Sequence, residues 1–255
     1  MSISLVADRG SHPEGIKSGK RARKSDAVYQ DLKRQILTGE MTSESPITEQ
    51  ALAQEYGCSQ STIREALMLL QEYGLVVRRG YQGTFVTDPS WTEARLMLKL
   101  RVSIESTGVA EAVKFITDNE LEQLHELDNQ FEFCRKQRDV FGCASVDIKF
   151  HLRLFEIARM PVLEPMLVRT FMILQRILLS TPRPDASWAR PSVTPHLIML
   201  DALAERDTEA ALAALRSHIL SSAILLAPQY YGTDMQRLLD QVETNFVAPA
   251  DLAGH

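Results

Sequence analysis

The chain has 255 residues, of which 45% are hydrophobic and 24% are charged, a composition typical of a soluble globular protein of one or two domains. This composition excludes a disordered tail, a collagen and a coiled-coil rod. No apolar run approaches the roughly 20 residues of a membrane span, and the N-terminus lacks the apolar core of a signal peptide. The three cysteines form neither a CxxC pair nor an even disulfide set. We therefore expect a cytoplasmic protein that does not contact a membrane.

The net charge of −5 is unevenly distributed along the chain. Residues 1–24 contain six basic residues against two acidic ones, whereas residues 91–255 contain 17 basic and 22 acidic residues and hold the whole negative charge. A basic arm joined to an acidic body is compatible with a DNA-binding head on an unrelated body. A solubilising tail has the same charge pattern, so charge alone leaves both interpretations open.

Three helices are predicted near the N-terminus. Residues 1–20 are polar, and we predict that they form a disordered basic arm. Ser25 can then cap a helix whose apolar residues recur every fourth position, until Gly39 ends it. A short second helix is expected behind Thr48, and a third helix with an apolar inner face is expected behind Ser59.

A β-hairpin is predicted behind the third helix. Residues 75–79 and 84–87 have the composition of strands, and Gly80-Tyr81-Gln82-Gly83 between them is typical of a turn. Three helices followed by a hairpin are the order of a winged helix-turn-helix, here over residues 21–88. In that fold the third helix enters the major groove and the wing contacts the DNA backbone or the minor groove. A helical subdomain with a hairpin and no role in DNA binding is the alternative.

Residues 47–87 also resemble the DNA-binding domain of the GntR family of bacterial transcription regulators. The resemblance rests on ITEQALAQEYGCSQSTIREALMLLQEYGLVVRRGYQGTFV, above all on S-x-S-T-I-R-E-A-L before a GLV strand and a glycine-containing wing. Gln60 and Gln50 depart from the family, whose members commonly carry Arg there, whereas Arg64 matches it. The predicted DNA contacts lie on the short helix, the third helix and the wing: Gln50, Ser59, Gln60, Ser61, Thr62, Arg64, Arg78, Arg79, Gly80 and Gly83.

The rest of the chain is predicted to be an antiparallel helical bundle over residues 91–228. Helices are expected over 96–116, behind a capping box at Thr117–Glu120, around Val146–Phe155, near 162–180, from Thr194-Pro195 to Ala204, and from Asp207 to about Leu226, with a proline-rich loop over 181–193. His125, with Glu126 and Asp128 nearby, is interpreted as a solvated side chain. Residues 229–255 form a C-terminal extension to which the sequence assigns no role.

One carboxylate and three imidazoles can converge inside this bundle. Asp147 and His151 are four residues apart and therefore share a helix face. His196 and His218 each lie ten or eleven residues from the turn at Arg206-Asp207, hence roughly 16 Å from it on two antiparallel helices. These four residues predict one divalent ion per chain, Zn²⁺ first and Ni²⁺ or Mn²⁺ as alternatives. The alternative is that these residues bind no metal. Asp147 would then interact favourably with the dipole of a helix N-terminus, and each histidine would be a hydrogen-bonded core residue.

Residues 91–228 resemble the FCD ligand-binding domain, which follows the winged helix in the FadR branch of the GntR family. The matching pieces are LKLRVSIE, VDIKFHLRLFEIA, PHLIMLDAL and LRSHIL. The resemblance implies six or seven helices around a cavity for a metal and a small organic acid. Asp147, His151, His196 and His218 fall on the Asp and three His of the metal-containing members.

The same resemblance puts Arg101 where FCD domains often place a cation near the effector. A guanidinium can bind a carboxylate through two parallel hydrogen bonds, so we predict that Arg101 binds the acid. The alternative is an ordinary surface arginine that pairs with Glu105 at i,i+4.

Together these observations predict a mainly α-helical one-component transcription regulator rather than an enzyme. A homodimer would bind a pseudo-palindromic operator, and an acid that ligates the metal would change the spacing of the two DNA-binding heads. The family implies repression that the effector releases. A sensor of the metal ion itself is an alternative. A metalloenzyme is another, since Asp and three His with open coordination can activate water, but it lacks an evident general base and leaves the winged helix unexplained.

Overall fold

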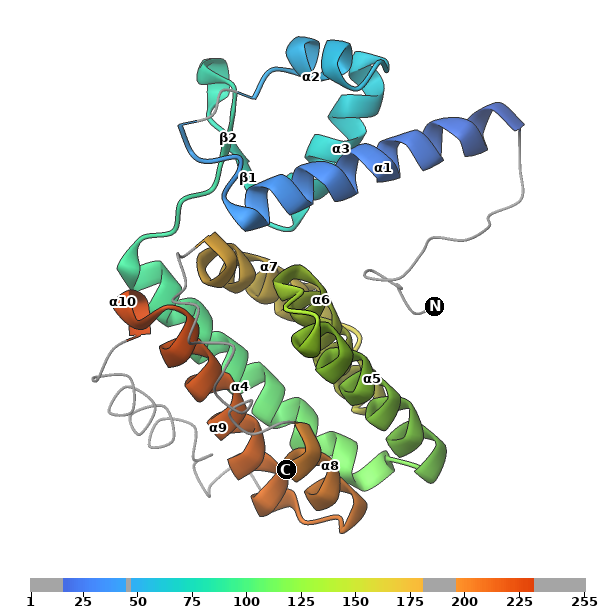
Figure 1. The fold of residues 1–255 in the computed structure, drawn as a ribbon, viewed down its shortest axis with the longest axis vertical. Coiled ribbons are helices and arrows are strands. Elements are labelled where there is room, and N and C mark those ends of the chain that lie inside the picture. Colours follow the sequence, from blue (N-terminus) through green and yellow to red (C-terminus); the bar gives the residue numbers. More distant parts are fainter. Residues whose placement is uncertain (1–15, 45–46, 181–195, 232–255) are drawn as a thin grey trace, which may run out of the picture.

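The computed structural model describes residues 16–44, 47–180 and 196–231 and is mainly α-helical (Figure 1). Its helices are α1 (Ile16–Thr38), α2 (Glu49–Glu55), α3 (Gln60–Glu72), α4 (Trp91–Phe115), α5 (Asp118–Lys136), α6 (Val140–Ile157), α7 (Glu164–Ser180), α8 (His196–Ala204), α9 (Thr208–Leu226) and α10 (Pro228–Tyr231). Strands β1 (Val76–Arg78) and β2 (Thr84–Val86) form the one sheet of the described residues. The expected loop at 181–193 and the Thr194-Pro195 helix start lie outside the described residues.

The first helix begins earlier than predicted. Helix α1 begins at Ile16 rather than at Ser25, so residues 16–20 of the expected disordered arm are helical. Residues 20–24 that follow are Lys, Arg and Ala, which favour helix, whereas the prediction rested on the polar composition of residues 1–20 as a whole. Ser25 is therefore no cap; its hydroxyl donates to the carbonyl of Thr62 (3.4 Å) and joins α1 to α3.

The helix-turn-helix and the wing follow the predicted order. Thr48 accepts a hydrogen bond from the Ala51 N–H (3.3 Å) and Ser59 accepts one from the Thr62 N–H (3.2 Å), which confirms both predicted caps. The two strands pair antiparallel in the register Val76↔Val86, Val77↔Phe85 and Arg78↔Thr84. The turn between them needs a glycine at Gly83, whose φ of 102° an L side chain rarely adopts.

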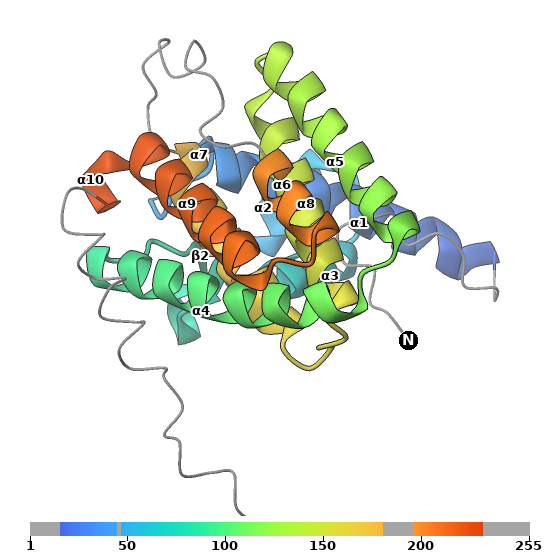
Figure 2. The ribbon, with the colours of Figure 1, turned by 90° about the horizontal axis from the view of Figure 1, so that it is seen from below.

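Helices α4 to α10 form the bundle, in which α4 packs against α6, α7 and α9, and α5 packs against α6 and α8 (Figures 1 and 2). Helix α4 begins at Trp91, five residues before the predicted start, because Ser90 and Glu93 form a capping box. At Gly108 a Cβ atom would lie 2.5 Å from the Phe155 ring. The glycine thus allows α4 and α6 to approach closely, which brings their polar side chains together.

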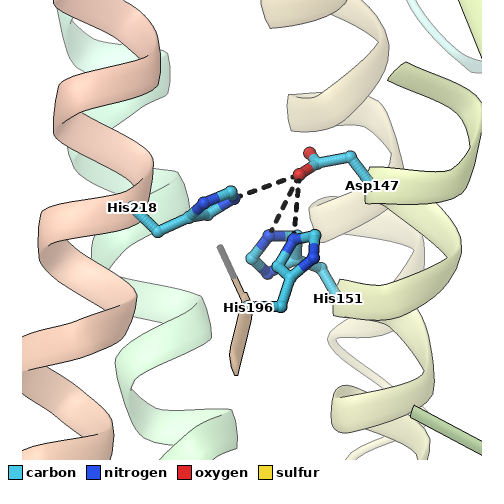
Figure 3. Close-up of side chains that lie close together, drawn as sticks. All are labelled: Asp147, His151, His196 and His218. Carbon is cyan, nitrogen blue, oxygen red and sulfur yellow. Dashed lines mark hydrogen bonds and ion pairs between the residues drawn. The ribbon is translucent and has the colours of Figure 1, made fainter. Parts of the chain in front are cut away.

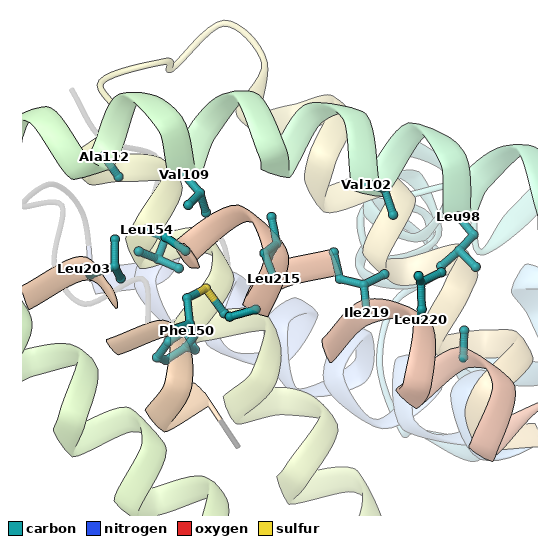
Figure 4. Packing of buried hydrophobic residues seen from close by; sticks show 14 of the residues in the cluster. Leu98, Val102, Val109, Ala112, Phe150, Leu154, Leu203, Leu215, Ile219 and Leu220 are labelled. Atoms are coloured by element: carbon teal, nitrogen blue, oxygen red, sulfur yellow. The ribbon is translucent and has the colours of Figure 1, made fainter. Parts of the chain in front are cut away.

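Two hydrophobic clusters hold the described residues together. The first fills the bundle, with Leu98, Val102, Phe150, Leu215 and Ile219 among its buried members (Figure 4). The second, which we call the interdomain cluster, contains buried residues of α1, α3 and the wing together with seven residues of α6 and α7: Ile148, Leu152, Phe155, Leu167, Val168, Phe171 and Met172. The helix-turn-helix and the wing therefore pack directly on α6 and α7.

The C-terminal extension contributes to the bundle core. Its first residues belong to α10, a helix the sequence did not predict, and Tyr231 there is fully buried. The Tyr231 hydroxyl donates to the Ala94 carbonyl (3.3 Å) and holds α10 against α4. The bundle thus extends beyond the predicted boundary at residue 228.

One described helix, α9, is long and apolar enough to cross a membrane by length and composition. The core helix of a soluble protein passes the same test. Leu215 and Ile219 of α9 belong to the buried cluster of the bundle, where α9 packs against α4 and α8. The packing accounts for the apolar composition of this helix.

Candidate metal centre and DNA-binding surface

Four side chains from three helices meet in the middle of the bundle (Figure 3). Asp147 and His151 lie one turn apart on α6, His196 is the first residue of α8, and His218 lies on α9. One ligand atom from each lies within 4.8 Å of the others, and the three histidines are buried. The structure therefore brings together the four residues that the sequence singled out.

The spacing of these atoms suits a single ion. Oδ1 of Asp147 lies 3.0 Å from Nε2 of His218, 3.3 Å from Nε2 of His196 and 3.7 Å from Nε2 of His151. Ligand atoms about 2.1 Å from a common ion lie roughly 3.0 to 3.4 Å apart in octahedral or tetrahedral geometry. Two of the three separations from Asp147 fall in this range, while the ligand atoms of the whole set lie within 4.8 Å of one another and would have to draw closer around an ion.

Two further carboxylates lie behind the histidines. Nδ1 of His196 hydrogen-bonds to Oδ1 of Asp128 at 3.0 Å. Nδ1 of His151 lies 2.5 Å from Oε2 of Glu105, a close ion pair without hydrogen-bond geometry. Both carboxylates are buried. The solvated surroundings expected for His125 do not extend to Asp128, which is 2% exposed. The missed signal was its position one turn after the buried Leu124.

Arg101 lies in the same buried network. Its Nε donates to Oε1 of Glu105 (2.6 Å), and its Nη2 lies 3.6 Å from Oδ2 of Asp147. The guanidinium also lies over the ring of Phe171, 4.7 Å from the centroid. Arg101 is 5% exposed, so the alternative of a surface arginine is wrong, although the Glu105 partner it included is present. Nη2 makes no hydrogen bond within the described residues.

The electrostatics of the centre favour a bound cation. The carboxylates of Glu105, Asp128 and Asp147 outweigh the single guanidinium of Arg101, and without a metal ion a protonated His151 offsets part of this negative charge. A divalent ion would take the place of that proton. Burial disfavours the charged form of His151, but Glu105 and Asp147 overcome this and raise its pKa to about 9.

Asp147 and His218 of the cluster also have shifted pKa values. Burial raises the pKa of Asp147, but the positive charge of His151 and the contacts with the neighbouring imidazoles outweigh it and hold that pKa well below its usual range. Burial lowers the pKa of His218 to about 4, so this imidazole is neutral at pH 7. A carboxylate and a neutral imidazole are the forms in which these side chains bind a metal.

The predicted DNA contacts separate into exposed and buried residues. The exposed ones are Gln50, Ser59, Gln60, Ser61, Arg64, Arg78, Arg79 and Gly80, whereas Gly83 is partly buried in the wing turn. Thr62 is 4% exposed, and its hydroxyl bonds to that of Ser59 (2.9 Å). The prediction that Thr62 contacts DNA is therefore corrected: its position is structural, because it completes the cap of α3.

Arg64 is exposed but already paired. Its Nε and Nη2 donate to the two carboxylate oxygens of Glu49 on α2, at 3.1 and 2.6 Å. Arg79 of the wing lies over the Phe85 ring, 5.2 Å from its centroid. DNA contact by Arg64 would thus compete with a bidentate ion pair, a feature invisible in the sequence.

Comparison with known proteins identifies the class. The profile described as bacterial regulatory proteins, gntR family, matches residues 24–86, and that of the FCD domain matches residues 96–221. The chain therefore belongs to the GntR family of bacterial regulators, with an FCD domain behind its helix-turn-helix. Members of this family bind DNA, and they are transcriptional regulators rather than enzymes.

Individual relatives support the same assignment. The chain is 26% identical over 131 residues to the HTH-type transcriptional repressor RspR of Escherichia coli, a match that covers 51% of this chain and 58% of that protein. It is 24% identical over 221 residues to the galactonate operon transcriptional repressor of Escherichia coli, covering 78% and 95%. Among solved structures, E. coli McbR/YncC has a TM-score of 0.66 at 22% identity, covering 81% of this chain and 98% of that one. The structural likeness shows the fold alone.

Proposed function

We propose that this protein is a cytoplasmic transcriptional repressor that binds a pseudo-palindromic operator as a homodimer. A small carboxylic acid would control it by binding at one divalent ion per chain, zinc first and nickel or manganese as alternatives. Asp147, His151, His196 and His218 would hold the ion. The metal would supply a Lewis-acidic site for the carboxylate, and the acid would release the operator.

The observation that carries the proposal is the hydrogen-bonding state of Arg101. Its Nη2 is buried without a hydrogen bond in the described part of the chain, 3.6 Å from Asp147. A buried guanidinium N–H without a partner costs free energy, and a carboxylate at the metal would lie within its reach. Glu105 holds the other side of the guanidinium at 2.6 Å, which keeps Nη2 aimed at the cluster.

The DNA-binding surface would be the exposed face of α3, with the wing beside it. Ser59, Gln60 and Ser61 lie at the exposed N-terminal turn of α3, the part of a recognition helix that reaches base edges. Arg78 and Arg79 are exposed on the wing and would contact phosphates. Two copies related by a two-fold axis would place both recognition helices on one face of the duplex.

The interdomain cluster supplies a path between the two activities. Phe171 belongs to this cluster and lies under the guanidinium of Arg101. On α6, Ile148 and Leu152 belong to the same cluster and directly follow Asp147 and His151 in the sequence. A ligand that moves Arg101 or the histidines would therefore press on residues that pack against α1 and α3.

The test is a two-stage titration of DNA binding. An operator is first selected from random duplexes, and its affinity is measured with metal-free protein, with Zn²⁺, and with Zn²⁺ plus each of a panel of small carboxylates. Weakening by one acid, only with metal present, supports the proposal. If Zn²⁺ alone changed the operator affinity fully, the protein would be a sensor of the ion instead. The variant Arg101→Ala should lose the response of operator affinity to the acid. Arg153→Ala, which replaces an arginine outside the cluster, should keep that response.

A further inference from the structure

Asp128 is a buried carboxylate that the proposed metal site does not use as a ligand. It lies on α5, a helix that contributes none of the four residues of the cluster. Its side chain is 3% exposed, and its hydrogen bond to His196 is 3.0 Å long. A buried carboxylate is costly unless it is paired, so its position needs an explanation in what it does to His196.

The imidazole of His196 is held on several sides. The ring of Phe150 stacks on it at 3.9 Å with an interplanar angle of 19°, and the ring of Phe131 meets it edge-on at 5.3 Å. Asp128 contacts Nδ1, and Nε2 is left facing Asp147 at 3.3 Å. Packing thus sets the plane of the ring, and Asp128 contacts one of its two nitrogens.

The three histidines differ in this support. Glu105 lies at Nδ1 of His151 but is shared with Arg101 at 2.6 Å. For His218 the contact with a carboxylate is at Nε2, to Asp147. Among the three histidines, Asp128 therefore contacts His196 alone.

We propose that Asp128 is a positioning residue that holds His196 in the Nδ1–H tautomer and so presents the Nε2 lone pair to the metal ion. The inference rests on the proposed metal site. A neutral imidazole has one N–H, and donating it to Asp128 leaves Nε2 unprotonated and directed at Asp147. Two acceptors would then face each other at 3.3 Å, an arrangement that a cation between them relieves. A carboxylate behind a ligating histidine also raises its basicity.

The experiment measures Zn²⁺ affinity of the full chain by competition with a chelator of known affinity. Asp128→Asn keeps the shape of the side chain but removes its charge, and we expect it to weaken Zn²⁺ binding roughly 10- to 100-fold. Glu126→Gln is the matched control, because Glu126 is an exposed carboxylate two residues away on α5. The Zn²⁺ affinity of this variant should equal that of the wild type. Asp128→Asn affinity within twofold of the wild type would overturn the inference.

A second measurement needs no variant and covers the case in which Asp128→Asn does not fold. In zinc-loaded wild-type protein, the ¹⁵N signals of His196 should show a protonated Nδ1 and a metal-bound Nε2. Coordination through Nδ1 would refute the role of Asp128. Wild-type protein that binds no divalent ion would overturn the proposed metal site, and the role of Asp128 would fall with that site. By contrast, an unchanged Zn²⁺ affinity of Asp128→Asn, or coordination through Nδ1, would refute the role of Asp128 alone.

Discussion

Replacement of Lys33 by Met tests the interface on which the DNA-binding part rests. Lys33 lies on α1, which packs against α7, and only 9% of it is exposed. Burial, with the nearby positive charge of Lys149 as a smaller cause, lowers the pKa of Lys33 from 10.5 to about 8. At about 1.36 kcal/mol per pKa unit, this shift corresponds to a stability penalty of up to about 3 kcal/mol. Methionine fills similar space without a charge, so Lys33→Met should be more stable at pH 7 by an amount of this order.

The sign of the pH dependence follows from linkage. Below pH 8 both the folded and the unfolded chain hold the Lys33 proton, and the penalty is complete. Between pH 8 and 10.5 the folded chain has lost the proton that the unfolded chain still binds, so wild-type stability rises with pH relative to Lys33→Met. Urea unfolding at pH 7 and near pH 10.5 measures both values, with the exposed Lys136→Met as control. Equal stabilities at pH 7, or a difference that persists at high pH, would refute the reasoning.

Three further predictions concern the site and the DNA. Purified protein should contain about one divalent ion per chain, and His218→Ala should lose most of it and melt at a lower temperature; metal content unchanged by elemental analysis would disprove ligation by this residue. Arg101→Ala should weaken binding of the effector carboxylate by roughly 1.5–3 kcal/mol, the scale of a hydrogen bond to a charged group. If titration calorimetry finds no change in effector affinity, Arg101 is not part of the binding site. Gln60→Arg should shift one symmetric pair of operator positions toward G·C by ~1–3 kcal/mol per half-site, and identical motifs from randomised-operator selections of both proteins would show that Gln60 touches no base edge.

The convergence of the four cluster residues could be predicted because it depends on regular geometry. Residues four apart, such as Asp147 and His151, lie on the same face of any α-helix. The short turn between α8 and α9 makes these two helices antiparallel neighbours. Equal distances from that turn then place His196 and His218 at one height. That the α6 pair meets this second pair depends on the position of α6 in the bundle, which the resemblance to the FCD domain supplied.

The groups around the cluster could not be predicted in the same way. Arg101 and Glu105 form an i,i+4 pair that looks like a solvated surface pair, because charged residues are seldom buried. Their burial depends on the position of α4 between α6, α7 and α9, which no local pattern contains. Asp128 had a local signal in the buried Leu124 one turn earlier, but its acidic neighbourhood suggested solvent.

Helix α7 contacts both the buried Arg101 and the end of α3 through different residues. Phe171 contacts the guanidinium of Arg101, and Nη1 of Arg169 donates to the carbonyl of Glu72 (3.0 Å), the last residue of α3. The guanidinium of Arg169 also lies against Gly74, where a Cβ atom would be 3.1 Å from Cζ of Arg169. Because packed cores resist local compression, we propose that a displacement of Arg101 by a bound acid would be passed through Phe171 to α7. The end of α3, to which Arg169 donates a hydrogen bond, would then move with α7.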